Sequence, residues 1–216
     1  MDLAYLLRSL PDLAEGALVT AELAGVALLC AGLGGLPVAA ARRSHRRWLR
    51  QLSGTYVEVM RNTPILVQLA VLYFGLPTIG LYPDAFISAA IALTLQNAAY
   101  TGEIYRAGIA SVASGQAEAA AALGMRPTGV YLRVVLPQAL RRVVPSLGNQ
   151  AVVIIKDTSI ASTVALAELT SSAKLQLDRS AAPYETFLLV ALLYLLMSGT
   201  ALGLLKLAAL RFPVRV

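Results

Sequence analysis

Polar residues that could bind a charged solute are concentrated in two places in this otherwise apolar chain. In the first, Gln96, Tyr100 and Glu103 stand at i, i+4 and i+7, which is one face of a helix. Such a face favours a polar path through an apolar environment, whereas Glu103 could instead form a structural ion pair with Arg106 one turn later. Three further amides belong to the same hypothesis of a polar path: Gln68, Asn97 and Asn149.

The second place is Lys156-Asp157-Thr158-Ser159, which interrupts an apolar run that extends from Val143 to Ile155 and resumes from Ile160 to Leu166. These residue types compete for backbone hydrogen bonds and cap helices, so we expect a helix to break there. The N–H groups of a half-helix starting at the break could hold a carboxylate. Alternatively, Lys156 and Asp157 pair with neighbouring helices and only shape the bundle.

Other kinds of chemistry find little support in the residue inventory. The chain has one cysteine, Cys30, and one histidine, His45, so neither a Cys/His zinc site nor a disulfide framework can be assembled. There is no Ser/His/Asp, Cys/His or paired-carboxylate constellation, and no Gly-Lys dipeptide of a phosphate-binding loop. We therefore expect neither a metal, nor a catalytic site, nor a bound cofactor in this chain.

The elements that must position these residues are those of a membrane protein. Of the 216 residues, 57% are hydrophobic and 14% are charged, well below the quarter or so that is charged in soluble domains. We predict one all-α domain over residues 1–216 with five transmembrane helices. They are expected at about Ala17–Ala41, Thr63–Leu76 together with Tyr56–Arg61, Ala85–Tyr105, Val143–Leu166 with its interruption, and Tyr184–Leu205.

Two details of packing follow from these segments. Gly32, Gly34 and Gly35 in the first should allow another helix to approach closely. In the second, Glu58 and Arg61 lie one turn apart and could pair.

Positive charge predicts the orientation in the membrane. Of the 18 Lys and Arg residues, five lie in residues 42–50, five in 106–142 and three in 206–216, all on one predicted side. The positive-inside rule places this side in the cytoplasm, with the N-terminus outside and the C-terminus cytoplasmic. The net charge of +6 is thereby explained by topology, without a nucleic-acid partner.

A cytoplasmic loop of about residues 111–137 contains a candidate docking element. From Ser111 to Arg126 the sequence is rich in Ala, which favours a short helix, and Gly124 followed by Pro127 predicts a stop and a new start. The small side chains would let another protein approach, and Glu118 would supply one charged contact.

This loop resembles that of the permease subunits of ABC importers, whose pattern is Glu-Ala-Ala, three residues, Gly, nine residues, Ile, any residue, Leu-Pro. Glu118-Ala119-Ala120, Gly124 and Leu136-Pro137 match it, and Val134 replaces the usual Ile. Further segments resemble the polar amino-acid branch of histidine, glutamine and arginine type, although Asn62 stands where Gly is common. These segments are Arg61–Gln68, Tyr73–Pro77, Ala99–Ile109, Pro137–Arg142, Leu147–Gln150 and Lys156–Ser159.

The resemblance implies a type I importer permease fold in the bacterial cytoplasmic (inner) membrane, with the short loop helix as a coupling helix. It implies ATP-binding subunits as partners, which would hold ATP and Mg, a second permease subunit in a homodimer or heterodimer, and an extracytoplasmic substrate-binding protein. Membrane lipid surrounds such a protein. The cargo would be polar amino acids or similar compounds.

Two other classes of function compete with this one. A secondary carrier or channel acting alone is disfavoured by the short chain and by the lack of a visible inverted repeat. A membrane enzyme or assembly factor is disfavoured because no catalytic constellation is evident, although carboxylates far apart in sequence could meet in space.

Overall fold

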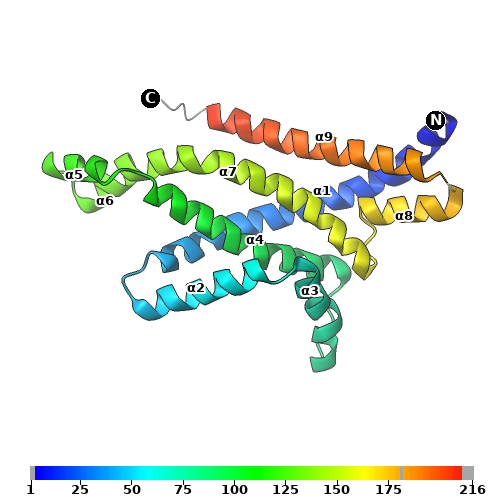
Figure 1. Ribbon diagram of the computed structural model, residues 1–216, viewed down its shortest axis with the longest axis horizontal. Coiled ribbons are helices and arrows are strands. Elements are labelled where there is room, and N and C mark those ends of the chain that lie inside the picture. The colour runs from blue at the N-terminus through cyan, green and yellow to red at the C-terminus, as the bar shows by residue number, and fades with distance from the viewer. Residues whose placement is uncertain (1–2, 181, 211–216) are drawn as a thin grey trace.

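The computed structural model describes residues 3–180 and 182–210, and all regular structure in these residues is helical. Four long helices run along the long axis of the molecule: α1 (Leu3–Arg42), α4 (Ala85–Ala110), α7 (Leu136–Asp157) and α9 (Pro183–Leu210) (Figure 1). Short elements connect them. They are α2 (Arg47–Asn62), α3 (Ile65–Ala70), η1 (Val71–Gly75), η2 (Leu76–Ile79), α5 (Ser114–Ala122), α6 (Pro127–Val130), η3 (Tyr131–Val135), η4 (Thr158–Val164) and α8 (Leu169–Ser180).

Small residues bring α1 and α4 into close contact, as predicted for the glycines of the first segment. A methyl group added at Gly35 would lie 2.9 Å from the backbone nitrogen of Gly102, and one at Gly34 would lie 3.2 Å from the Cβ of Ala98. Backbones approach this closely only where side chains are absent. The packing of α1 along α4 is therefore the most extensive helix pair in the described structure.

The second predicted segment is sharply bent, which its apolar pattern did not predict. Helix α2 ends at Asn62, and the segment Ile65–Ile79 leaves it at an angle of 101°. Pro64 causes the break, because it lacks an N–H group and disfavours helical geometry at the preceding residue. Thr63 accordingly adopts an extended conformation, with φ −102° and ψ 128°.

The predicted pairing of Glu58 with Arg61 is also wrong. The carboxylate of Glu58 accepts a hydrogen bond from the side-chain amide of Asn62 at 3.0 Å. The guanidinium group of Arg61 lies over the ring of Tyr100 instead, 5.0 Å from its centroid. A cation is attracted to the negative face of an aromatic ring, so this contact ties the end of α2 to α4.

Two apolar clusters hold the long helices together. The larger one joins α1, α4 and α7 through buried residues such as Leu23, Leu93 and Ile154. The smaller one joins α1, α8 and α9 through Leu13, Leu169 and Val190. Helix α8 is thus packed into the bundle, although it is too short to cross a membrane.

Within the described residues, Ser9–Arg42 and Pro183–Leu207 are long and apolar enough to span a membrane, and the bent pair of Arg47–Asn62 and Ile65–Ile79 would make a third span if counted as one. Helices α4 and α7 fall short of this criterion: α4 buries polar residues such as Gln96 and Asn97, and α7 carries exposed polar residues such as Arg142 and Ser146. The link between α1 and α2, the loop with α5 and α6, and the end of α9 gather at one end of the molecule (Figure 1). The basic stretches of residues 42–50 and 106–142 and the start of the stretch 206–216 therefore lie toward this same end of the molecule. Residues 211–216 lie outside the described residues.

Candidate functional site

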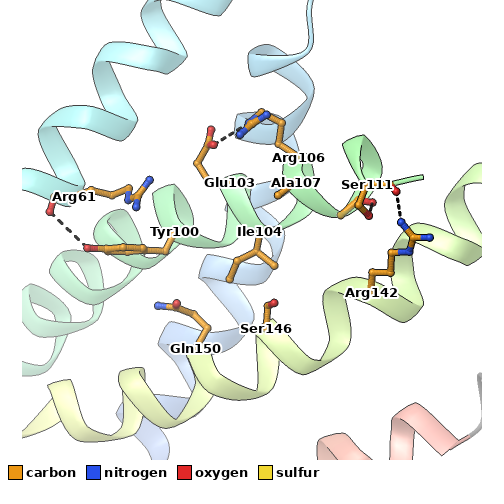
Figure 2. Close-up of a pocket in the computed structure, with 11 residues that line it drawn as sticks. Arg61, Tyr100, Glu103, Ile104, Arg106, Ala107, Ser111, Arg142, Ser146 and Gln150 are labelled. Atoms are coloured by element: carbon orange, nitrogen blue, oxygen red, sulfur yellow. Dashed lines mark hydrogen bonds and ion pairs between the residues drawn. The ribbon is translucent and has the colours of Figure 1, made fainter. Parts of the chain in front are cut away.

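A cavity of about 510 Å³ lies between α4 and α7, with the end of α2 beside it (Figure 2). Ile104 of α4 points toward α7 and Tyr100 extends from α4 toward Arg61, while Ser146 and Gln150 of α7 point back toward α4. Arg142, Ser146 and Gln150 stand at i, i+4 and i+8, so one face of α7 forms a wall of the cavity. Tyr100 and Glu103, which the sequence placed on one polar face, line the opposite wall.

Glu103 is held by two arginines at the edge of this cavity. Its Oε1 accepts a hydrogen bond from Nε of Arg42 and its Oε2 from Nε of Arg106, each at 2.8 Å. The pair with Arg106 is the one that helix spacing allowed, whereas Arg42 comes from the end of α1 and could not be inferred from local sequence. With both oxygens engaged, Glu103 links α1 to α4 as well as lining the cavity.

The remaining charges give the cavity a positive character. Arg61 stacks on Tyr100, and the Tyr100 hydroxyl donates a hydrogen bond to the Arg61 carbonyl at 3.5 Å. Arg142 donates a hydrogen bond to the carbonyl of Ser111 at the C-terminal end of α4, where helix carbonyls attract cations. Because Glu103 is already paired twice, these two guanidinium groups leave an excess of positive charge that suits a carboxylate.

Gln68 and Gln96, both predicted to line a polar path, meet at the break between α2 and α3. The side-chain amide of each donates to the carbonyls of Met60 and Thr63, at distances of 3.0 to 3.3 Å. These carbonyls lose helical partners because Pro64 and the extended Thr63 interrupt the helix. The two glutamines thus stabilise the bend, and the Oε1 atom of Gln68 has no hydrogen-bond partner in the described structure.

Asn97 is buried between α4 and α7 and is part of a short chain of amides. Its Nδ2 donates to the Leu93 carbonyl at 2.8 Å, and its Oδ1 accepts from Nε2 of Gln150 at 2.6 Å. Asn149, its predicted companion, is exposed. Sequence analysis did not select Gln150, although its helical spacing from Arg142 and Ser146 is a signal that could have found it.

The half-helix start expected at Lys156–Ser159 is absent from the described structure. Helix α7 ends at Asp157 and continues directly as the 3-10 helix η4. The hydroxyl of Thr158 donates back to Ile155 at 2.6 Å and that of Ser159 to Lys156 at 2.7 Å, so both bind carbonyls of the preceding turn. At this point the α-helix passes directly into the narrower 3-10 helix, and no new helix starts. No free N–H groups of a helix start are therefore available.

A true helix start occurs farther along the chain, at Leu169, and it is capped by the carboxylate of the buried Glu168 directly before it. The Glu168 carboxylate accepts from the Ser171 N–H at 2.8 Å, the Tyr194 hydroxyl at 3.0 Å and the Thr20 hydroxyl at 3.4 Å. It therefore ties α8 to α1 and α9. Sequence analysis missed this residue, although an acidic residue directly before a helix is a capping signal.

The predicted helix–turn–helix of the loop is confirmed. Helix α5 ends in a turn in which Met125 N–H binds the Ala120 carbonyl and Gly124 N–H binds that of Ala121. Gly124 has φ +79°, which favours glycine at this helix end. Glu118 and Ala119 are exposed while Ala120 faces inward, and Leu123 is 85% exposed. Leu136 and Pro137 begin α7, where proline is tolerated.

Comparison with known proteins identifies the family. The family model described as the inner membrane component of binding-protein-dependent transport systems matches residues 31–211. The nopaline transport system permease protein of Agrobacterium fabrum is 37% identical, over 96% of this chain and 90% of its own length. A probable glutamine ABC transporter permease protein of Bacillus subtilis is 36% identical, over 98% of this chain and 97% of its own length.

Solved structures agree with this result. An amino acid ABC transporter crystallised with histidines matches with a TM-score of 0.90 and 34% identity, over 98% of this chain and 99% of that one. A chain of the MetNI methionine ABC transporter, with a TM-score of 0.72 and 17% identity, shares the fold. The chain belongs to the binding-protein-dependent transport family and is an ABC importer permease, a component of the inner membrane, and not the ATPase of such a system.

Proposed function

We propose that this permease carries polar amino acids or closely similar compounds into the cell, driven by ATP hydrolysis on a separate subunit. The relatives named for nopaline and glutamine transport, and the neighbour crystallised with histidines, support this class of cargo. The observation that carries the proposal is the basic cavity between α4 and α7. An amino acid has a carboxylate in every case, and the excess positive charge of Arg61 and Arg142 favours that group.

The substrate path in this proposal runs along the facing surfaces of α4 and α7. Tyr100, Ser146 and Gln150 would contact the polar parts of the solute in the cavity, and Asn97 would position Gln150. Farther along α7, Lys156 and Asp157 would face the solute where the helix tightens. Glu103 would keep the wall of the cavity in place through its two arginines.

Energy would enter at α5. This helix is exposed, small side chains surround Glu118, and Leu123 offers an apolar contact at its end. A hydrogen bond of 3.5 Å between Gln138 of α7 and Gln116 of α5 links the two helices. A movement of α5 would therefore reach the helix that carries Arg142, Ser146 and Gln150.

The chain would act in a larger assembly. Two ATP-binding subunits, which hold ATP and Mg, would dock from the cytoplasm, one on the α5 of each permease subunit. A second permease subunit would complete the path, and an extracytoplasmic binding protein would deliver the solute. Five crossings, with the N-terminus outside and the C-terminus inside, would place α5 on the side of the ATP-binding subunits.

Reconstituted transport tests the proposal. The permease is placed in liposomes with its ATP-binding subunit and substrate-binding protein, and ATP-dependent uptake of labelled arginine, glutamine and histidine is measured. Glu118→Lys should abolish uptake and reduce co-purification of the ATP-binding subunit. Asp178→Lys is the matched control, because this exposed carboxylate lies on α8 at the opposite end of the molecule.

A second pair of variants tests the cavity. Ser146→Phe should block it, whereas Val153→Phe places the same side chain at an exposed position of α7 outside the cavity. Uptake that withstands Ser146→Phe would exclude this cavity from the path, and uptake that withstands Glu118→Lys would exclude α5 as the entry point of energy.

A further inference from the structure

Two mainly apolar cavities follow one another along α1, between α1 and α7. The first, of about 300 Å³, is lined by residues that include Leu36, Ala40 and Leu140. The second, of about 530 Å³, is lined by residues that include Leu28, Gly32 and Leu204. Tyr105 and Leu147 line both cavities, so the two are neighbours, and we call them together the α1–α7 groove.

One cation stands at the end of this groove. Among the described residues that line the two cavities, Arg43, directly after α1, is the only charged one, and it is exposed. Within residues 3–180 and 182–210 it forms no ion pair and no side-chain hydrogen bond. The neighbouring Arg42 differs, because it is bound to Glu103. Tyr131 lines the same cavity as Arg43, as is typical of residues at a membrane interface.

We propose that the α1–α7 groove binds an anionic phospholipid of the cytoplasmic leaflet, with the phosphate at Arg43 and an acyl chain along the apolar lining. Charge complementarity selects this occupant, because a free cation at the mouth of an apolar groove matches an anionic headgroup on a hydrocarbon chain. A polar amino acid does not fit, since the described residues of the groove include no carboxylate that could receive its ammonium group. The site is therefore separate from the proposed transport of amino acids.

The part of the groove from Arg43 to Gly32 matches one leaflet, and the lining continues along α1 to Gly25. Half of a hydrocarbon core of about 30 Å is about 15 Å, which corresponds to roughly ten residues of α-helix. Counted back from Arg43, this distance reaches the level of Gly32, where the two cavities meet. The chain would end beside Leu147, one helical turn from Gln150, so the lipid would support the helix that forms one wall of the basic cavity.

Lipid retention measured by native mass spectrometry tests this inference on the purified complex with its ATP-binding partner. Phosphatidylglycerol is titrated against phosphatidylcholine of the same chain length. We expect Arg43→Gln to weaken phosphatidylglycerol binding about tenfold, because one charge-assisted contact is lost. Arg43→Lys should retain most of the binding. Arg47→Gln is the matched control, since Arg47 belongs to the same basic block but lies outside the groove, and it should bind as the wild type does.

A second variant tests the acyl chain. Ala40→Phe fills the first cavity and should reduce retention of both lipids, with the charge of Arg43 intact. Three results would overturn the inference. The first is an equal loss of phosphatidylglycerol binding in Arg43→Gln and Arg47→Gln, and the second is displacement of phosphatidylglycerol by glycerol phosphate alone. The third is cross-linking of Leu36→Cys between two permease copies in a Cys30→Ser background, because a second copy would then cover the groove.

Discussion

The contact between Gly35 of α1 and Gly102 of α4 offers a sharp test of how the helices are held together. In Gly35→Ala, the new methyl group would lie 2.9 Å from the Gly102 nitrogen and 2.9 Å from Cγ2 of Thr101. One of these neighbours is backbone and cannot rotate away. The helices must therefore move apart by several tenths of an ångström, which weakens the packing on either side of the contact.

Gly25→Ala in the same helix is the matched control, because a methyl group there would meet no atom within 4 Å. Both variants gain about 1 kcal/mol of helix propensity over glycine. This gain is the same in both variants, so the difference in their free energies of unfolding reports the steric clash alone. Overpacking of this kind typically costs about 1–3 kcal/mol.

The assay is thermal unfolding of the two purified variants in the same detergent. A difference of about 2 kcal/mol corresponds to about 4–8 °C in a chain of this size, with Gly35→Ala the less stable variant. Gly25→Ala should equal or exceed the wild type. Equal unfolding temperatures for the two variants would refute the close approach of α1 and α4.

Three further predictions concern polar groups and the loop. Gln68→Leu and Gln96→Leu should each cost less than about 1 kcal/mol, because the other glutamine still serves the two carbonyls at the bend, whereas the double variant should cost about 2–3 kcal/mol; additive unfolding shifts would show that the glutamines do not share these carbonyls. Glu168→Ala should cost about 2–3 kcal/mol and Tyr194→Phe only about 1 kcal/mol, since the first leaves several donors without a partner; equal unfolding temperatures would contradict this ranking. Gly124→Ala should strain the turn after α5 by about 1–2 kcal/mol and lower ATP-dependent uptake, while Gly115→Ala, a position with open space and no unusual φ, should preserve uptake; equal loss in both would remove the role of the left-handed turn.

The loop shows what local sequence can predict. Its helix depends on alanine propensity, its stop on the left-handed freedom of Gly124, and its restart on Pro127, all of which act over a few residues. The bend at Pro64 also has a local cause, but the apolar run that crosses it suggested one continuous span. Hydropathy alone therefore misled the prediction, because it does not register backbone geometry.

The site was predicted less completely, because its contacts join distant residues. The helix spacing of Gln96, Tyr100 and Glu103 indicated a polar face. The hydrogen bonds from Gln96 to the carbonyls of Met60 and Thr63, however, depend on where the end of α2 lies against α4. Arg42 reaches Glu103 across 61 positions in the chain. No periodic pattern encodes such a pairing.

By itself, the sequence determined the membrane class, the helical segments, the loop helix with its turn and the family, because these depend on composition, local backbone preferences and short motifs. Only the tertiary structure decided which polar groups remain available. Gln68 and Gln96 serve the bend, and Glu168 caps the start of α8. Arg61, Arg142, Ser146 and Gln150 surround the cavity. A polar side chain in an apolar interior binds whichever partner packing brings within reach, so its role follows from helix placement and not from residue type alone.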